Sequence, residues 1–310
     1  MQDIVSHNGT TAPEWIPEWI AVDWGTSNLR AWAMGPDGVL AEAVSDEGMG
    51  GLAREAFEPA LRRLTGPWLQ AGQVPVVACG MVGARQGWFE APYRAVPCAP
   101  VAAGENVPVP QAGLAVQIVP GLMQAKPADV MRGEETQIAG ALALHPGFDG
   151  VFCLPGTHSK WAGVSAGEVV SFQTFMTGEM FALLSRQSVL RHGMAGSGWD
   201  DAAFDQGVEE GLQRPERIAA LLFRLRAEGL VAGLTADAAR ARLSGLLIGC
   251  ELAAARPYWL GARVMLIGEA GLCGLYARAL ARQGLTATRL EARDCTIAGL
   301  AKAAGRMGDR

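Results

Sequence analysis

The order of apolar segments and turns repeats once along this chain, and this repetition constrains the fold more than any other feature. Each half opens with an apolar strand that runs into a glycine-threonine turn, Gly25-Thr26 in the first half and Gly156-Thr157 in the second. Two further antiparallel strands and then alternating helices and strands follow each turn. An order of elements that occurs twice indicates two similar α/β domains. We expect these domains to span residues 18–148 and 149–310.

Hydrophobic pattern and turn residues place the individual elements. In the first half we expect strands and helices at residues 19–24, 29–34, 39–44, 55–71 (helix), 74–79, 116–120 and 134–144 (helix). In the second half we expect strands at 151–154, 160–164, 168–175, 264–267 and 285–290, with helices across 176–256, 272–283 and 296–304. Residues 1–17 are interpreted as a loose extension, because Pro13 and Pro17 interrupt any regular pattern.

Charge, hydropathy and cysteine spacing exclude several classes of protein. The net charge is −5 without a run of like charges, so a nucleic-acid-binding surface is not predicted. The longest apolar stretch, residues 243–255, contains Glu251 and is shorter than the ~20 residues that span a bilayer. The N-terminus lacks the pattern of a secretion signal, and the six cysteines form no C-x-x-C pair. We therefore expect a cytoplasmic protein without a membrane partner, and leave open whether it forms a homo-oligomer.

The two glycine turns are candidates for binding a polyphosphate. Glycine lets the backbone approach a ligand closely, and the backbone N–H groups of such a turn form a concavity that binds anions. One turn by itself is an ordinary hairpin, whereas two in duplicated halves suggest that they hold a nucleotide from both sides of a cleft. The predicted contacts are Gly25, Thr26, Ser27, Asn28, Gly156, Thr157 and His158. The chain contains no P-loop, G-x-G-x-x-G or G-x-S-x-G motif.

The residues beside the turns differ between the halves. Asp23 precedes the first turn, where its carboxylate could position Mg²⁺ through the waters of the ion or simply cap the turn. Lys160 follows the second turn and is either a phosphate ligand or a solvated lysine. Further on, Gly268 and Gly271 mark a strand-to-helix turn at which an adenosine could lie, although such turns are common. Thr177 is expected to cap a helix.

Two polar segments of the first half are candidates for catalysis and substrate binding. Glu134 and Glu135, at a predicted helix start, could orient a hydroxyl and take its proton, or could only favour the helix dipole. A substrate carboxylate needs an arginine fork, for which Arg85 and Arg132 are candidates. We favour Arg85, because Arg132 could be occupied by the adjacent glutamates. In the loop after residue 79, Gln86 could bind hydroxyls and Trp88 could cover the substrate, unless this is a surface loop with a buried tryptophan.

Taken together, four segments resemble the 2-dehydro-3-deoxygalactonokinase family. They are residues 20–32, 79–88, 132–137 and 154–161, within a similarity that extends over residues 19–304. Ser27 stands where the family more often has threonine, and Glu134 stands where related sugar kinases have aspartate, which leaves Glu135 as an alternative base.

This resemblance implies a fold and a reaction. The fold would be that of the actin-like ATPase superfamily, an α/β protein whose two ribonuclease-H-like domains flank a cleft. The enzyme would use ATP and Mg²⁺ to phosphorylate the 6-hydroxyl of 2-dehydro-3-deoxy-D-galactonate, a small sugar acid. A kinase for another sugar or sugar acid, and a non-catalytic nucleotide switch, are the alternatives.

Overall fold

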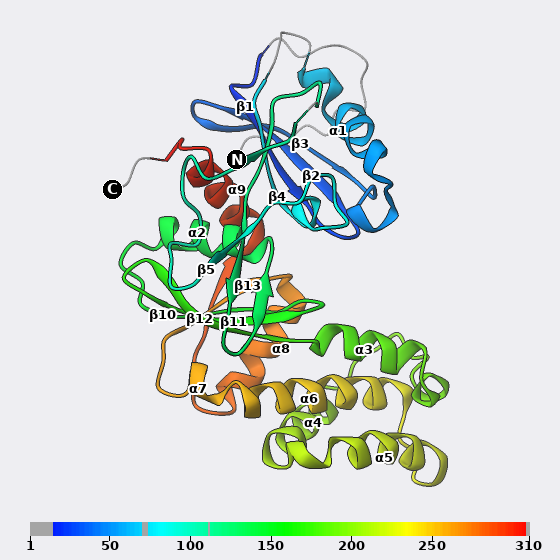
Figure 1. Ribbon diagram of the computed structural model, residues 1–310. Helices are drawn as coiled ribbons and strands as arrows, with labels where there is room; N and C mark the ends of the chain where they lie inside the picture. The colour runs from blue at the N-terminus through cyan, green and yellow to red at the C-terminus, as the bar shows by residue number, and fades with distance from the viewer. Residues whose placement is uncertain (1–14, 70–73, 111, 308–310) are drawn as a thin grey trace. The chain divides into compact units, whose positions relative to one another are not determined.

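The structure is a computed structural model that describes residues 15–69, 74–110 and 112–307 (Figure 1). Most of the extension expected at residues 1–17, and the last residues of the helix expected at 55–71, lie outside these ranges. The chain forms two compact units. The first contains the described residues up to 148 together with 166–169 and those from 292 onward, and the second contains 149–165 and 170–291. No helix of the described residues is both long and apolar enough to cross a membrane.

A six-stranded sheet forms the centre of the first unit. Its order is β3-β2-β1-β4-β7-β6, with bounds Gly38–Ser45, Leu29–Gly35, Trp19–Trp24, Val76–Gly80, Val116–Ile118 and Val107–Pro108. Strands β1 to β3 are antiparallel, whereas β1, β4 and β7 run parallel. Because Asp23 lies opposite Cys79 in this register, the carboxyl ends of β1 and β4 meet at one edge of the sheet.

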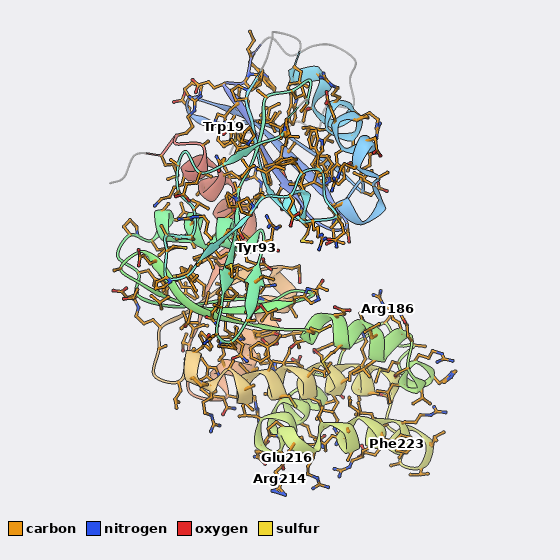
Figure 2. All side chains as sticks on the ribbon, viewed as in Figure 1. Trp19, Tyr93, Arg186, Arg214, Glu216 and Phe223 are labelled. Atoms are coloured by element: carbon orange, nitrogen blue, oxygen red, sulfur yellow. The ribbon has the colours of Figure 1, made fainter. Side chains whose placement is uncertain are left out.

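Both faces of this sheet are buried, and alternate residues of β1 pack on opposite faces. Ile20, Val22 and Trp24 pack in a cluster with α1 (Phe57–Thr65). Trp19, labelled in Figure 2, and Ala21 pack in a second cluster with α2 (Glu134–Leu144) and α9 (Ala292–Ala303). A smaller sheet of β5 (Tyr93–Ala95), β8 (Gly121–Gln124) and β9 (Asp129–Met131) was not predicted.

The C-terminal helix corrects the predicted domain boundary. We expected the second domain to continue to residue 310, but the second compact unit ends at Glu291. Helix α9 instead packs closely on α2, where glycines remove the side chains that would separate the two backbones. A Cβ atom added to Gly140 would lie 1.8 Å from the carbonyl oxygen of Cys295, and one added to Gly299 would lie 1.9 Å from that of Thr136.

A second sheet and six helices within the described residues form the second unit. The sheet order is β12-β11-β10-β13-β14, with bounds Glu168–Phe175, Ser159–Ser165, Gly150–Leu154, Val264–Gly268 and Thr288–Glu291. The helices are α3 (Thr177–Arg186), α4 (Asp201–Gln213), α5 (Ile218–Val231), α6 (Ala236–Ala254), α7 (Arg256–Trp259) and α8 (Ala270–Ala281). Strand β10 pairs antiparallel with β11 and parallel with β13, as β1 pairs with β2 and β4 in the first unit. The predicted fold of two duplicated α/β domains is confirmed.

Candidate active site

A cavity of about 180 Å³ lies in the first unit, at the edge where β1 and β4 end and α2 begins. Its lining includes Asp23, Gly25, Gly80, Arg132, Gly133 and Glu134. Gly80 and Gly133 both have positive φ angles, of 90° and 104°, which glycine adopts readily. A Cβ atom added to Gly133 would lie 3.3 Å from the Cα of Gly80. These two glycines therefore let the end of β4 and the start of α2 approach each other behind the cavity.

Asp23 presents a carboxylate to this cavity. Arg30 Nη1 lies 3.5 Å from Asp23 Oδ2, and the Cys79 thiol lies 4.0 Å from Oδ1. Burial raises the pKa of Asp23, Arg30 opposes that shift, and the charge of Glu134 adds to it. Within the described residues, no group of three or more histidine, cysteine, aspartate or glutamate side chains could hold a metal ion. Asp23 is therefore available as a single carboxylate, not as part of a cluster of such ligands.

The two adjacent glutamates occupy different environments. Glu134 lines the cavity, is partly exposed, and accepts a hydrogen bond from Arg132 N at 3.0 Å. Glu135 is fully buried and accepts hydrogen bonds from Gly133 N at 2.7 Å and from Thr136 Oγ1 at 3.1 Å. Burial and the neighbouring charge of Glu134 raise the pKa of Glu135 to about 8. Near neutral pH Glu135 is therefore mostly protonated, and Glu134 is the glutamate that faces the cavity.

Arg132 is the cationic side chain of this cavity. It is only 8% exposed, its Nη2 donates to the Ala91 carbonyl at 2.7 Å, and its guanidinium lies 4.3 Å from the ring centroid of Tyr93. Within the described part of the chain, the buried Nε and Nη1 atoms have no hydrogen-bond partner. Buried donors without acceptors cost free energy, so an anion that came within reach of these two atoms would be bound favourably.

The predicted substrate loop after β4 lines this cavity only at its start, with Gly80 and Met81. Arg85 and Gln86 are exposed and are not among the residues that line this cavity. Arg54 holds the loop by donating to the carbonyl oxygen of Arg85 at 3.0 Å. Trp88 is 9% exposed and packs in the core against Trp24 and Phe57, with both ring centroids 6.1 Å away. The expectation that Trp88 covers the substrate is therefore wrong, because the aromatic core takes up its ring.

The first glycine turn is braced by a segment that sequence reasoning missed. Gly25 N donates to the Asn28 carbonyl at 3.0 Å, while Thr26, Ser27 and Asn28 are exposed. From the following glycine-rich segment, Met49 N and Gly50 N donate to the carbonyl oxygens of Gly25 and Thr26, both at 2.9 Å. The cluster of glycines at positions 48, 50 and 51 was the available signal.

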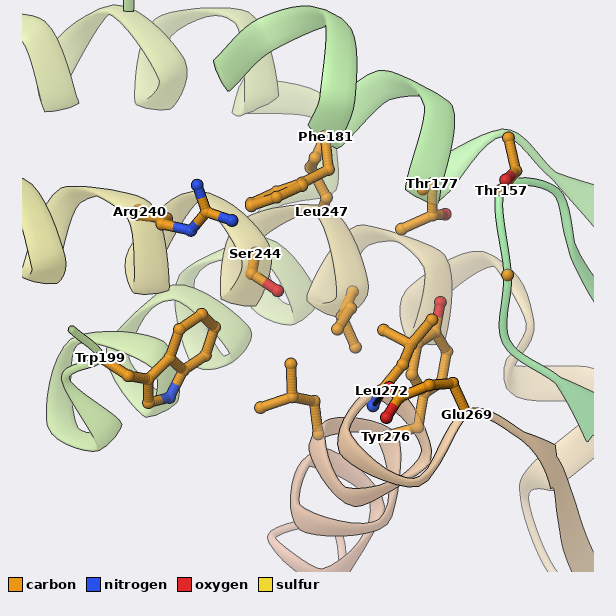
Figure 3. Close-up of a pocket in the computed structure, with 14 residues that line it drawn as sticks. Thr157, Thr177, Phe181, Trp199, Arg240, Ser244, Leu247, Glu269, Leu272 and Tyr276 are labelled. Carbon is orange, nitrogen blue, oxygen red and sulfur yellow. Dashed lines mark hydrogen bonds between the residues drawn. The ribbon is translucent and has the colours of Figure 1, made fainter. Parts of the chain in front are cut away.

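A larger pocket of about 410 Å³ lies in the second unit (Figure 3). One end is formed by Gly156, Thr157 and the start of α3, and the other by Phe181, Trp199 and Arg240. The Arg240 guanidinium lies 5.4 Å from the ring centroid of Phe181. The pocket thus combines a glycine turn with an aromatic and cationic end. Phe181, Trp199, Arg240 and Tyr276 carry no local sequence pattern and were not predicted.

Three predicted nucleotide contacts brace the second turn. Lys160 is 5% exposed and its Nζ donates to the His158 carbonyl at 3.0 Å, so the alternative of a solvated lysine is wrong. His158 Nε2 lies 2.6 Å from Glu179 Oε2. Gly268 closes against the turn, because an added Cβ atom would lie 3.0 Å from the Pro155 carbonyl oxygen.

At the start of α8 the pocket is lined by Glu269, which sequence reasoning missed, and Gly271 is not among the lining residues. Glu269 caps this helix, since its carboxylate accepts from Gly271 N and Leu272 N at 2.8 Å each. An acidic residue directly before a helix was the available signal. The predicted cap at Thr177 is wrong: Met176 is the N-cap residue of α3, and Thr177 lines the pocket.

Comparison with known proteins places the chain in a family. A sequence model of the family described as 2-keto-3-deoxy-galactonokinase matches residues 23–303. The chain belongs to this family. A protein of Rhizobium meliloti (strain 1021) named "Probable 2-dehydro-3-deoxygalactonokinase DgoK1" is 42% identical, over 92% of this chain and 95% of that protein. The 2-dehydro-3-deoxygalactonokinase of Escherichia coli (strain K12) is 36% identical, over 87% of this chain and 91% of that protein.

A solved structure agrees with this membership. A crystal structure from Sinorhizobium meliloti, of a protein assigned as a 2-dehydro-3-deoxygalactonokinase, superposes with a TM-score of 0.87 at 41% sequence identity. The match covers 92% of this chain and 98% of that one. The resemblance found in the sequence motifs is thus confirmed for the 2-keto-3-deoxy-galactonokinase family.

Proposed function

We propose that this member of the family is an ATP-dependent kinase that phosphorylates the 6-hydroxyl of 2-dehydro-3-deoxy-D-galactonate. One observation carries the proposal beyond family membership. The cavity of the first unit holds a partly exposed carboxylate, Glu134, beside a buried guanidinium, Arg132, that has two unpaired donor atoms within the described chain. A sugar acid brings the two groups that match them, a hydroxyl and a carboxylate.

In this proposal Arg132 binds the substrate carboxylate and Glu134 is the general base. The Nε and Nη1 donors of Arg132 point to different sides of the guanidinium, so one of them donates a single charge-assisted hydrogen bond to the substrate carboxylate. The substrate hydroxyl donates to Glu134, and its proton passes to that carboxylate as the hydroxyl oxygen attacks the γ-phosphorus of ATP. The bond between the γ-phosphorus and the bridging oxygen breaks, and ADP leaves with the bonding electrons. Arg85, on the exposed loop, has no part in this step.

The second unit supplies the nucleotide pocket. We assign the phosphates to the end formed by Gly156 and Thr157, with Lys160 and His158 holding that turn, and the adenosine to the end that contains Trp199. The turn at residues 25–28 is the proposed second phosphate contact, because its exposed hydroxyl and amide groups can donate to phosphate oxygens.

Magnesium fits the carboxylate at Asp23. Mg²⁺ binds few protein carboxylates and keeps several of its waters, so one partly exposed carboxylate at a cavity wall suits it. The ion, when bound, would neutralise charge on the phosphate oxygens. The raised pKa of Asp23 in the protein alone reflects burial and the nearby Glu134, both of which a cation would offset.

We also propose that the enzyme is cytoplasmic, where ATP is available and thiols stay reduced. None of the six cysteines, all of which lie in the described residues, forms a disulfide, and each is buried or partly buried. Free cysteines in this number are typical of a reducing compartment.

A coupled assay of ADP release over a panel of substrates tests the function. The panel should contain the C4 epimers of 2-dehydro-3-deoxyhexonate, a 3-deoxy-2-keto acid of another chain length, and neutral hexoses and pentuloses. We expect turnover with 2-dehydro-3-deoxy-D-galactonate and the 6-phosphate as product, identified by NMR. Faster turnover of a neutral sugar would overturn the assignment of Arg132, and nucleotide binding without turnover of any sugar would indicate a switch protein.

A further inference from the structure

A buried carboxylate lies beside the pocket of the second unit and has no role in the chemistry above. Glu251 of α6 is 2% exposed. Its Oε1 accepts from Trp161 Nε1 at 2.8 Å and its Oε2 accepts from the Tyr276 hydroxyl at 2.6 Å. The hydroxyls of Thr177 and Ser159 also hydrogen-bond to it. Among the described residues its partners are all neutral donors, so no cation balances its charge.

Burying such a carboxylate without a cation costs free energy of desolvation. A carboxylate without a cation costs several kilocalories per mole to desolvate, and hydrogen bonds return only part of that. Consistent with this, burial raises the pKa of Glu251 although its four hydrogen bonds oppose the shift. An apolar residue would fill the same space at lower cost. The side chains that the carboxylate holds in place explain its presence.

The partners of Glu251 come from the elements that surround the pocket. Ser159 and Trp161 are on β11, Thr177 begins α3, and Tyr276 is on α8. Two of these side chains, Thr177 and Tyr276, line the pocket itself, and both are labelled in Figure 3. The Glu251 carboxylate, on α6, therefore hydrogen-bonds to β11, α3 and α8, three elements that surround the pocket.

The start of α3 is also locked to the glycine turn. Glu179 N donates to the Thr157 carbonyl at 2.9 Å. A Cβ atom on Gly178 would lie 2.3 Å from the Gly156 carbonyl oxygen, so only glycine permits this contact. The position of Thr177 is thereby coupled to that of the turn. Because the Thr177 hydroxyl donates its hydrogen to Glu251, the lone pairs of its oxygen remain to accept a hydrogen bond from a ligand in the pocket.

We propose that Glu251 is a positioning residue for the nucleotide. It fixes the Thr177 hydroxyl as a hydrogen-bond acceptor beside the Gly156-Thr157 turn, and it fixes the Tyr276 ring in the pocket wall. The matching donor on the ligand is an O–H group, either a ribose hydroxyl or a water bound to the metal ion of the nucleotide complex. This inference rests on the proposed nucleotide pocket. It concerns binding of ATP and ADP, and leaves binding of the sugar acid unaffected.

Isothermal titration with ADP, with and without Mg²⁺, tests the proposal on the full chain. Glu251→Gln keeps the size of the side chain but replaces one acceptor oxygen by a donor, so we expect the Kd of ADP to rise about tenfold. Thr177→Val should raise it similarly, whereas Thr177→Ser, which keeps the hydroxyl, should restore the wild-type value. If Glu251 acts through Thr177, the double variant should bind no more weakly than the worse single variant.

A matched control uses a different charged network of α6, centred on the buried Arg242. Arg242 on this helix pairs with Glu228 and Glu210, and none of these three residues lines the pocket. Glu228→Gln should lower the Tm without changing the Kd of ADP or the KM of the sugar acid. A Glu251→Gln protein that loses Tm but binds ADP normally would show that Glu251 only stabilises the core, which overturns the proposal. So would independent, additive effects of Glu251→Gln and Thr177→Val.

Two further sets of titrations identify the hydrogen-bond donor on the ligand and test the nucleotide pocket itself. The Thr177→Val penalty should vanish for 2′- or 3′-deoxy-ADP if a ribose hydroxyl is the donor, and in the absence of Mg²⁺ if a metal-bound water is. Persistence of the full penalty in every arm would refute the acceptor role of Thr177. Should wild-type protein fail to bind ADP at all, the nucleotide pocket, and with it the proposed function of the second unit, would be wrong.

Discussion

The first unit places carboxylates where its central strands end, whereas the second unit has an apolar residue and an aromatic pocket at the corresponding place. Asp23 stands two residues before Gly25, and Leu154 stands two residues before Gly156. Both strands pair antiparallel with the next strand and parallel with a later one. Asp23 lines a cavity, but Leu154 is buried. The two units thus share the turn and its strand pairing, while the side chain beside the turn is charged in one unit and apolar in the other.

The units also differ in the use of a buried carboxylic acid. In the first unit Glu135 is fully buried at the start of α2, next to the partly exposed Glu134. In the second unit Glu251 is buried in the middle of the packed helices and bonds to residues that line the pocket. The proposed function accordingly assigns the sugar acid to the first unit and the main nucleotide pocket to the second. Substitutions that affect one substrate alone can test it.

The largest effect is expected at Glu134. Glu134→Gln removes the proposed base but keeps the size of the side chain, so kcat should fall roughly 10²–10⁴-fold. The Kd of ADP should stay near the wild-type value, because the proposed nucleotide pocket is in the other unit. Steady-state kinetics and titration of ADP measure the two quantities. A kcat close to wild type would remove Glu134 from the chemistry.

Glu135→Gln is the matched control for this substitution. With a pKa of about 8, Glu135 is mostly protonated at pH 7, and glutamine imitates the neutral acid. We therefore expect kcat to remain within a few-fold of wild type at pH 7. Because its folded-state pKa lies above the unfolded value, Glu135 should destabilise the protein progressively as pH rises from about 4.5 to about 8. The Tm of Glu135→Gln relative to wild type should rise over that window, and a constant difference would contradict the raised pKa.

The next largest effect is expected at Arg132. Arg132→Met keeps much of the buried stem but removes the charged donors, so the KM of the sugar acid should rise by about 1.5–3 kcal/mol in binding free energy. The KM of ATP should change little. Arg132→Lys is the informative comparison, because a lysine keeps the charge but lacks the planar guanidinium with its several donors. Equal increases in the KM of ATP and of the sugar acid would argue that Arg132 merely supports the fold.

The sequence predicts those features of the site that depend on residues close together in the chain, and misses those that depend on distant ones. The helix at residues 134–144 and the strand at 19–24 were predicted with the bounds that the structure has, since caps, glycines and apolar periodicity are local signals. Which of Arg85 and Arg132 is the better candidate for binding the carboxylate could not be predicted from neighbouring residues. It depends on Tyr93, from a small sheet that sequence patterns did not reveal, and on Ala91 just before that strand. It also depends on the burial of Trp88 against Phe57. The packing of α9 on the first unit was missed for the same reason, because it joins residues 292–303 to a helix more than a hundred positions earlier.

A smaller effect is expected at Asp23. Asp23→Asn removes the negative charge but keeps a group that can still hydrogen-bond within the turn. If Asp23 holds Mg²⁺ through its waters, the concentration of Mg²⁺ for half-maximal rate should rise several-fold, because one charge contact is lost. Rates measured over a Mg²⁺ series at saturating ATP and sugar acid provide the test. An unchanged Mg²⁺ dependence, with a lowered Tm, would leave Asp23 with a purely structural role in the first turn.

The smallest effect is expected at Arg85, and it sharpens the comparison within the first unit itself. Arg85 and Arg132 were both candidates for binding the carboxylate, yet Arg85 is exposed while Arg132 is 8% exposed with unpaired donors inside the described chain. An exposed charge interacts weakly with a ligand because water and salt screen it. Arg85→Ala should therefore change the KM of the sugar acid by less than about twofold, a difference of roughly 0.4 kcal/mol or less. The measurement is a KM series at low and physiological salt. A large increase in KM that persists at physiological salt would mean that the loop after β4 reaches the substrate, and would return the carboxylate contact to Arg85.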